Sequence, residues 1–399
     1  MLMNIFEEAA EVITRLENNG YEAYFVGGCV RDSLLQREIK DVDIATSASP
    51  EKVQELFEKV IPVGVEHGTV VVRYKGKSYE VTTFRKEGTY SDQRHPDEVI
   101  FINNIDDDLK RRDFTINSLA MNKEGEIIDL FNGRADIEQR IIRSVGNPKD
   151  RFLEDPLRII RALRFASQLG FQIEKNTFLQ MRQQQKEIET VAVERLTIEI
   201  TKLFQGEYVQ NGLNYLIEVE AFKYLPIFKN HKSLIKKLPP LTAFHSFAEV
   251  IALLHYLDKS ISISQWVKEW KCSNKVRSEA INLSESIEYY YKSGLDAWLI
   301  YRLHYSNVKA FTHLVKIISN DLNYSSNELT TYKKQLPIQK RVDLDFDGHD
   351  LHTVFPDFKK GPWMNKLLED LEYRVVMRYL ENKKPKIKEW IICHPPEIN

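Results

Sequence analysis

Two aspartates separated by one residue, Asp41 and Asp43, are the clearest candidates for chemistry in this sequence. They lie in the run KDVDIAT, where charged and apolar residues alternate as in a β-strand. Residues two apart in a strand face the same side, roughly 6–7 Å apart, so both carboxylates point together while Val42 and Ile44 point into the core. Two carboxylates on one face repel each other unless a cation lies between them. Because oxygen ligands suit Mg²⁺, which often also binds substrate phosphates, the pair indicates a metal site for phosphate chemistry. Two independent surface aspartates are the alternative.

A glycine turn and an arginine precede these aspartates. Gly27 and Gly28 end an apolar run, and Arg31 follows them. Glycine lets backbone N–H groups approach a phosphate closely, and arginine pairs with phosphate oxygens. We therefore expect one site, with a triphosphate held at Gly28 and Arg31 and the cation held by the aspartates. A third acid, Glu80, lies on an expected strand, and a catalytic role and an exposed strand position are both open for it.

Longer motifs around this site carry a resemblance to a known family. In chain order they are GGCVRD with DVDIAT, LKRRDFTINSLAM at 109–121, DLFNGRADI at 129–137, RFLEDPLRIIRALRFASQLGF at 151–171 and ERLTIEITKLF at 194–204. In this form and order they resemble the polymerase-β-like nucleotidyltransferases, in particular the class II tRNA nucleotidyltransferases (CCA-adding enzymes) and the bacterial poly(A) polymerases. The resemblance implies a Mg²⁺-dependent enzyme that adds nucleotides from CTP and ATP to the 3′ end of tRNA.

The segment around Glu154 offers a way to choose the base. A helical wheel over 151–166 puts most apolar residues on one side and most charged residues, Asp155 and Arg158 included, on the other. One interpretation is a solvent-exposed helix face with ion pairs such as Glu154 with Arg158. The other is base recognition, because a carboxylate only accepts hydrogen bonds and a guanidinium only donates them. Such a pair matches the exocyclic amine and ring nitrogen of cytosine and adenine, and it leaves polar groups unpaired against guanine and uracil.

The family resemblance implies this second use for Asp155 and Arg158, with protein side chains in place of a nucleic-acid template. It also implies that Arg112, Arg161 and Arg164 contact the nucleotide. For Arg112 the alternative is an ion pair with a neighbouring acid, either Asp108 or Asp113.

Secondary-structure patterns divide the chain into a mixed N-terminal part and a helical remainder. The runs Thr69–Tyr74 and Ser78–Phe84 predict a β-hairpin, and Met121–Leu130 predicts a second one. After Asp150 helical periodicity dominates. We therefore predict an α+β protein with a polymerase-β-like α/β head followed by an all-α neck, body and tail. The predicted parts are a catalytic head at 1–145, a nucleotide-selecting neck at 146–206, a helical body at 207–335 and a tRNA-binding helical tail at 336–399.

Composition limits how this protein binds RNA. The 399 residues carry a formal net charge of −2, which excludes a chain coated with basic residues for non-specific nucleic-acid binding. tRNA must therefore be held by local patches. The candidates are Lys236-Lys237, Lys333-Lys334, Lys340-Arg341 and the group Lys383, Lys384, Lys386 and Lys388.

The sequence also bears on location and assembly. The N-terminal run has glutamates where a signal peptide has basic residues, and it predicts an amphipathic helix. No apolar run approaches the length of a membrane span. The cysteines Cys29, Cys272 and Cys393 are far apart and indicate neither a disulfide framework nor a zinc site. We expect a cytoplasmic protein without membrane partners, with a homodimer left open.

Three other functions compete with CCA addition. Bacterial poly(A) polymerases typically carry a basic pair in a segment that here reads PVGVEHG, at 62–68, and the lack of that pair favours CCA addition. An enzyme that adds only CC is the second alternative, and the segment 84–101 speaks weakly against it, because a loop of similar length and position is associated in the family with the switch from C to A. A non-catalytic RNA-binding protein is the third, and the intact Asp41, Asp43 and Arg31 argue against it.

Overall fold

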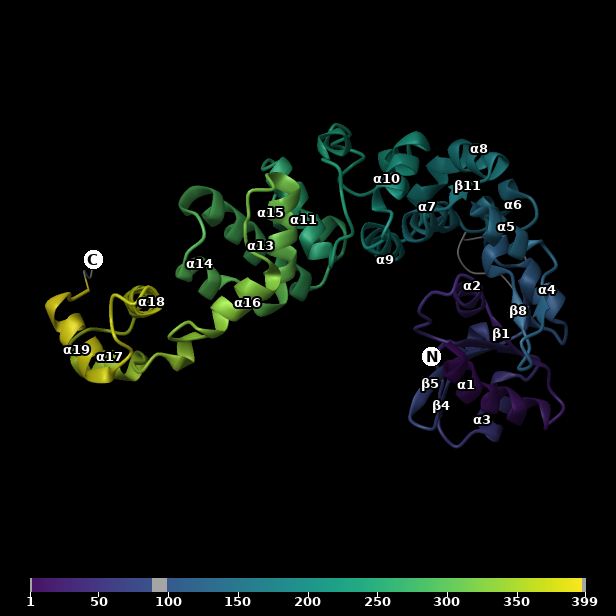
Figure 1. The fold of residues 1–399 in the computed structure, drawn as a ribbon, viewed down its shortest axis with the longest axis horizontal. Helices are drawn as coiled ribbons and strands as arrows, with labels where there is room; N and C mark the ends of the chain where they lie inside the picture. The colour runs from purple at the N-terminus through teal and green to yellow at the C-terminus, as the bar shows by residue number, and fades with distance from the viewer. Residues whose placement is uncertain (1, 88–98, 397–399) are drawn as a thin grey trace. The chain divides into compact units, whose positions relative to one another are not determined.

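A computed structural model of the chain describes residues 2–87 and 99–396. It divides into two compact units, Met1–Lys236 and Lys237–Asn399, each with its own buried core (Figure 1). The four-part division predicted from the sequence is finer than this and stays a prediction. Most of the segment 84–101, which we associated with the switch from C to A addition, lies outside the described residues.

A seven-stranded mixed sheet organises the first unit, with the strand order β3-β4-β5-β2-β1-β8-β9. The strands are β1 (Ala23–Val26), β2 (Asp43–Thr46), β3 (Val60–Ile61), β4 (Thr69–Tyr74), β5 (Lys77–Thr83), β8 (Ala120–Met121) and β9 (Ile127–Ile128). Neighbouring strands are antiparallel except β2 and β5, which are parallel and pair Asp43 with Glu80. Shorter pairs are β6 (Arg85–Glu87) with β7 (Val99–Phe101) and β10 (Ile141–Ile142) with β11 (Gln172–Ile173).

Both predicted hairpins are present. The first joins β4 and β5 through Lys75 and Gly76, whose φ angles of 47° and 80° are those that a tight two-residue turn needs. β5 begins at Lys77 rather than at Ser78. The second hairpin joins β8 and β9. The sheet and its hairpins, followed by helices, confirm the α+β class.

Helices cover the sheet and follow it in the first unit. They are α1 (Leu2–Glu17), α2 (Gly28–Leu34), α3 (Pro50–Leu56), α4 (Ile105–Lys110), α5 (Gly133–Gln139), α6 (Pro148–Glu154), α7 (Leu157–Leu169), α8 (Lys175–Gln184), α9 (Val193–Phe204) and α10 (Val209–Glu218). The predicted amphipathic N-terminal helix is α1, which packs on β1 and α3. Its residues Ala9, Val12, Ile13 and Leu16 recur at helical spacing and are fully buried.

The helix predicted around Glu154 is two helices, so this prediction is wrong. α6 ends at Glu154, the next residue Asp155 has an extended φ of −144° and ψ of 97°, and α7 follows Pro156. Proline disfavours helical geometry at the residue before it and has no N–H to continue the hydrogen-bond ladder. Asp155 and Arg158 therefore flank a helix junction and do not share one continuous helix.

α7 is also too buried for the first of our two interpretations, a solvent-exposed helix face. Arg158 and Arg164 are each 7% exposed, because α9 and α10 pack against this helix. The close packing depends on small residues, since a Cβ on Gly206 would lie 2.0 Å from Ser167 Oγ. The arginines of α7 thus project from a tightly packed helix, which limits how far they can move.

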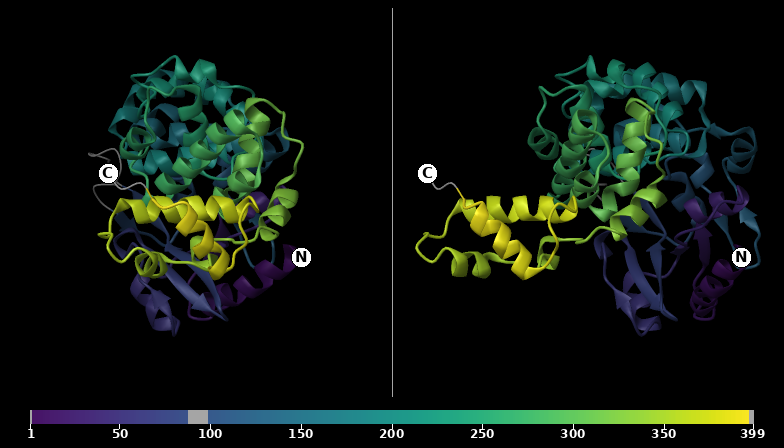
Figure 2. Two further views of the ribbon diagram at one scale, coloured as in Figure 1. Left: turned by 90° about the vertical axis from the view of Figure 1, so that its left-hand side faces the viewer. Right: turned by 60° about the vertical axis from the view of Figure 1, so that its left-hand side comes forward.

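The described part of the second unit contains helices and no strands, and Figure 2 shows this helical character. Its helices are α11 (Phe247–Leu257), α12 (Ile263–Glu269), α13 (Asn274–Ser293), α14 (Ala297–Arg302), α15 (Val308–Ile318), α16 (Ser326–Lys334), α17 (Gly348–Val354), α18 (Pro362–Val376) and α19 (Lys384–Cys393). Trp266 and Trp270 are fully buried in its core. Within the described ranges, every helix is too short or too polar to cross a bilayer.

The prediction that Lys333 contacts RNA is wrong. Lys333 on α16 is 2% exposed, and its Nζ donates hydrogen bonds to the carbonyl oxygens of Ile300, at 2.7 Å, and Tyr301, at 2.8 Å. Burial lowers the pKa of Lys333 to about 8. The side chain therefore satisfies carbonyl groups near the end of α14 and cannot contact RNA in this conformation.

Candidate active site

A cavity of about 1070 Å³ in the first unit brings together every site residue predicted from the sequence. These residues are Gly28, Arg31, Asp41, Asp43, Arg112, Asp155, Arg158, Arg161 and Arg164. Among the described residues, eleven lysines and arginines and seven carboxylates line the cavity. It therefore concentrates positive charge in a chain whose net charge is −2.

The two aspartates enter the cavity at the start of β2. Val42 and Ile44 are 4% and 1% exposed, which is the predicted alternation, although the strand itself begins at Asp43 rather than at Lys40. No described lysine or arginine forms an ion pair with either aspartate. Burial, together with the negative charges of Glu80 and Asp41 and partly offset by Arg112, raises the pKa of Asp43 to about 6. The pair is thus an acidic site without a counter-cation of its own.

Glu80 neighbours Asp43 in the sheet but does not line the cavity. It is paired in register with Asp43 on β5, but it is exposed and is not among the described residues that line the cavity. In residues 2–87 and 99–396, three metal-ligand atoms gather within 4.8 Å of one another only in the second unit. In this conformation Glu80 is therefore not positioned to bind a metal ion together with Asp41 and Asp43.

The glycine turn between β1 and α2 places Arg31 in the same cavity as the two aspartates. Gly27 has φ of +71° and directly precedes α2, and a Cβ there would lie 3.0 Å from Nη1 of Arg112. Both the φ angle and this contact require glycine. From α2 the Arg31 guanidinium pairs with Asp32 at 2.9 Å and donates to Oδ1 of Asn117 at 2.5 Å.

The two adjacent arginines before Asp113 share a buried acid. Arg111 and Arg112 pair with Asp108 at 2.6 and 3.0 Å. Burial alone would raise the pKa of Asp108, but the two guanidinium groups hold it below its usual range. The alternative that we left open for Arg112, an ion pair with Asp108, is therefore present. It does not exclude nucleotide contact, because Arg112 also lines the cavity.

The arginines on α7 join a second buried network. Arg161 pairs with Asp113 at 2.6 Å, and Arg164 pairs with Glu199 on α9 at 3.0 Å. Burial alone would raise the pKa of Asp113, but the charge of Arg161 holds it well below its usual range. Burial, and then the charge of Arg161, lowers the pKa of Arg164 to about 10. These arginines are thus fixed by protein carboxylates before any substrate binds.

Sequence reasoning missed three residues that organise this network. Asn117 accepts a hydrogen bond from Arg31 and donates one to Oδ1 of Asp113 at 3.1 Å. It therefore links Arg31 to the carboxylate that pairs with Arg161. Phe165 lies under the guanidinium groups of Arg31, Arg161 and Arg164, the nearest at 4.2 Å from the ring centre. Glu199 is the third. The motifs that contain Asn117 and Glu199 were recognised in the sequence, but sequence spacing does not show which side chains these two residues contact.

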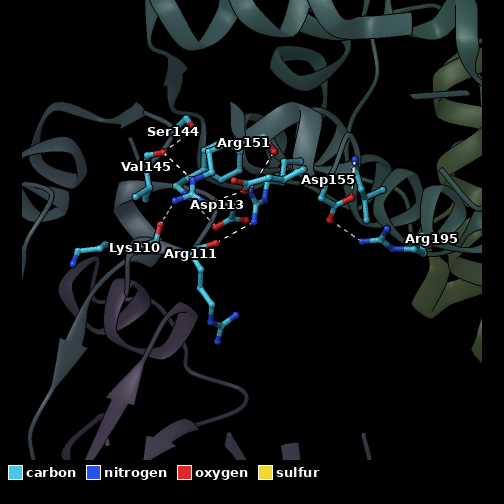
Figure 3. Close-up of polar contacts among 12 residues, drawn as sticks. Lys110, Arg111, Asp113, Ser144, Val145, Arg151, Asp155 and Arg195 are labelled. Carbon is cyan, nitrogen blue, oxygen red and sulfur yellow. Dashed lines mark hydrogen bonds and ion pairs between the residues drawn. The ribbon is translucent and has the colours of Figure 1, made fainter. Parts of the chain in front are cut away.

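Asp155 and Arg158 both have protein partners, and Figure 3 shows the contact between Asp155 and Arg195. Oδ2 of Asp155 accepts from Nη2 of Arg195 on α9 at 2.8 Å, and its Oδ1 accepts from the N–H of Leu157 at 3.2 Å. Arg158 pairs with Glu154 at 2.7 Å, as the ion-pair interpretation expected. It also donates to the carbonyl oxygens of Arg151 and Arg111 at 3.1 and 3.0 Å.

A glycine turn, an unpaired carboxylate couple and fixed arginines around one cavity, carried by this mixed sheet, define a nucleotidyltransferase head. Comparison with protein families agrees. Residues 23–143 match the model for the poly A polymerase head domain, residues 170–239 match that for the RNA- and SrmB-binding site of polymerase A, and residues 242–391 match that for tRNA nucleotidyltransferase domain 2.

Similarity extends over the whole chain in individual relatives. The chain is 49% identical to the CCA-adding enzyme of Oceanobacillus iheyensis over 401 residues, covering 100% of both chains. It is 40% identical to that of Anoxybacillus flavithermus over 400 residues, covering 99% of this chain and 98% of the relative. The crystal structure of the Bacillus stearothermophilus CCA-adding enzyme in complex with CTP matches with a TM-score of 0.85 at 35% identity, covering 97% of this chain and 96% of that one. The chain therefore belongs to the family of CCA-adding enzymes, as the sequence motifs indicated.

Proposed function

We propose that this protein adds the sequence CCA to the 3′ end of tRNA, without a template, from CTP and ATP. The observation that carries the proposal is the joint lining of one cavity by the carboxylate pair Asp41 and Asp43 and by the donor–acceptor pair Arg158 and Asp155. The first pair suits transfer of a nucleotide, and the second suits the choice of its base.

The carboxylate pair fits a divalent cation, which we propose to be Mg²⁺. Two acids that repel each other, and that have no cationic partner among the described residues, supply the oxygen ligands that Mg²⁺ prefers. When bound, the ion would neutralise phosphate charge and activate the attacking hydroxyl.

In the proposed reaction the 3′-hydroxyl oxygen of tRNA attacks the α-phosphorus of the nucleotide. The 3′-hydroxyl releases its proton to water and a new O3′–P bond forms. The bond from that phosphorus to the bridging oxygen breaks, and pyrophosphate leaves with its electron pair. We assign Gly28 and Arg31 to the triphosphate, since a guanidinium at the start of a short helix beside an open glycine binds phosphate oxygens well. Arg112, Arg161 and Arg164 would hold the rest of the nucleotide.

The base-selecting pair keeps hydrogen-bonding capacity for a base. A guanidinium has five N–H groups, and Arg158 directs three hydrogen bonds to described protein acceptors. The Asp155 carboxylate accepts two hydrogen bonds from the protein, whereas a carboxylate can accept roughly four. The internal contacts orient both groups, and the remaining donors and acceptors would read cytosine or adenine. Pre-orientation of this kind lowers the entropy cost of binding a base, because little rotamer freedom remains to be lost.

An end-addition assay tests the proposal. A tRNA that lacks its 3′ CCA is incubated with Mg²⁺ and with CTP, ATP or both, and product length is read on a gel. We expect a product of fixed length that requires both nucleotides. A long tail from ATP alone would show a poly(A) polymerase instead, and a product that stops after CTP incorporation in the presence of both nucleotides would show a CC-adding enzyme.

A further inference from the structure

Three side chains in the second unit form a cluster that nucleotide transfer does not use. Glu249 on α11 is fully buried. Its Oε1 lies 2.5 Å from Nδ1 of His313 on α15, and its Oε2 lies 3.1 Å from Nδ1 of His245, just before α11. One ligand atom from each of the three residues lies within 4.8 Å of the other two.

The buried carboxylate has no cationic side chain to neutralise it. No described lysine or arginine forms an ion pair with Glu249. An ionised carboxylate removed from water is costly unless it is paired or coordinates a metal. The two neighbouring imidazoles neutralise it only if one of them carries an extra proton, whereas a metal ion would neutralise it with both imidazoles in their neutral form.

The surroundings of His313 match those of a metal ligand. Its second ring nitrogen, Nε2, lies 2.6 Å from the hydroxyl of Thr242. Histidines that bind metals usually donate their other N–H to an oxygen acceptor, which fixes the tautomer and the ring orientation. With Nε2–H directed at Thr242, Nδ1 of His313 would be the unprotonated, ligating nitrogen, and it is the nitrogen that faces Glu249.

We propose that His245, Glu249 and His313 bind one Zn²⁺ ion, with the Glu249 carboxylate and the Nδ1 atoms as ligands. Two imidazoles and a carboxylate are a common zinc ligand set, and zinc ligands about 2 Å from the metal lie roughly 3.3 Å apart in a tetrahedron. The observed 2.5 and 3.1 Å separations need only small rotations to reach that arrangement. The fourth position would hold water, and the His245 side chain, 48% exposed, gives the ion access from solvent.

The proposed site ties together parts of the chain that are distant in sequence. Thr242 and His245 lie in the segment before α11, and His313 lies on α15, which packs on α11 (Figure 1). A bound ion would therefore cross-link the entrance segment of the second unit to its helical core. Binding to the native state alone stabilises that state in proportion to the logarithm of ligand concentration.

The test uses the full chain with Asp41→Asn and Asp43→Asn, which removes the carboxylate pair of the first unit as a competing metal site. Zinc stoichiometry is measured after dialysis, and Co²⁺ is added as a spectroscopic probe. We expect one ion per chain, visible absorption typical of four-coordinate Co²⁺ with nitrogen and oxygen ligands, and a higher melting temperature with Zn²⁺ than with EDTA.

Matched variants locate the ion. His245→Ala removes a half-exposed ligand and leaves the core intact, so we expect it to weaken binding more than about 100-fold, and Thr242→Val to weaken it roughly 10- to 100-fold. His349→Ala, an exposed histidine outside the cluster, should bind as the parent does. The proposal is overturned if the parent takes up no stoichiometric metal, or if His245→Ala binds as tightly as His349→Ala. In either case the cluster is a hydrogen-bonded carboxylate–imidazole network only.

Discussion

Arg195 on α9 holds Asp155, which lies between α6 and α7, by a 2.8 Å ion pair. The acceptor half of the base-selecting pair is therefore positioned from α9, a helix that the base need not touch. Asp155 lies just after the end of α6, so helical hydrogen bonds do not hold its backbone rigidly. The contact with Arg195 fixes the position of its side chain instead.

Removing this contact should reduce selectivity more than turnover. In Arg195→Gln we expect discrimination of CTP and ATP against UTP and GTP to fall about tenfold, because a hydrogen bond between charged groups contributes about 1.5–3 kcal/mol. The measurement is kcat/KM for all four nucleotides. Lys202→Gln, an exposed residue on the same helix that also lines the cavity, is the control. Equal effects of the two changes on all nucleotides would contradict a positioning role.

The double substitution Asp155→Ala with Arg158→Ala should abolish the preference for C and A while metal binding persists. Some stability should be lost as well, about 1–3 kcal/mol, since Arg158 is buried and its removal takes one of two arginine partners from Glu154 and a hydrogen-bond donor from the carbonyl oxygen of Arg111. Arg158→Lys is the matched variant, because it keeps the charge and loses the planar fork of donors. If the double variant still rejected UTP and GTP as strongly as the parent, base selection would lie elsewhere.

Asp41→Ala should stop nucleotide incorporation without unfolding the protein. Asp41 is exposed and has no ion-pair partner in the described part of the chain, so its removal costs little stability. Loss of a metal ligand that contributes several kcal/mol to the transition state corresponds to a rate reduction of roughly a thousandfold or more. Single-turnover rates and circular dichroism check both parts. Glu38→Ala, another exposed acid of the cavity, should retain most of the activity.

Asp43→Asn should stabilise the metal-free protein at neutral pH. The pKa of Asp43 is raised to about 6 from an ordinary value near 4, so the native state binds this proton more tightly than the unfolded state does. The parent accordingly loses stability as pH rises from about 4 to 6, by on the order of 2–3 kcal/mol, and the loss levels off above pH 6. Asparagine does not titrate. Urea unfolding in EDTA should therefore show a variant-minus-parent difference that grows from pH 4 to 6; a constant difference would contradict the raised pKa.

Glu80→Gln separates the two roles left open for this residue. The Glu80 charge is one cause of the raised pKa of Asp43, so its neutralisation should move the acid limb of the pH–rate profile to lower pH and leave the plateau rate within a fewfold of the parent. Glu55→Gln, which changes an exposed acid outside the cavity, should leave the profile unchanged. A plateau rate reduced by orders of magnitude would instead make Glu80 a catalytic acid.

The sequence predicted best what depends on local periodicity. Alternation around Asp43 placed both aspartates on one face, and Gly76 and Gly125 marked the turns of the two hairpins. Strand pattern and turn chemistry are properties of neighbouring residues, so both could be predicted. The α+β class followed from the same local signals.

What sequence reasoning could not reach depends on contacts between distant segments. A helical wheel assumes a continuous helix, so it did not register that Pro156 separates Asp155 from Arg158. The wheel also left a solvent-exposed face open for the arginines of α7, whereas α9 and α10 bury two of them. In the sequence Lys333 cannot be distinguished from a surface lysine, because its carbonyl partner Ile300 lies on another helix. The partners of Asn117 and Glu199 are likewise set by tertiary packing.

The excess of basic side chains in the cavity, within a chain of slightly negative charge, has a consequence for how substrates arrive and leave. Counter-ions screen such a local field within about 8 Å at physiological ionic strength, so polyanions are attracted near the cavity mouth and not over the whole surface. Raising the salt concentration should then slow capture of nucleotides far more than it alters the chemical step. A short-range field of this kind also allows products to diffuse away, which favours repeated turnover over retention of RNA.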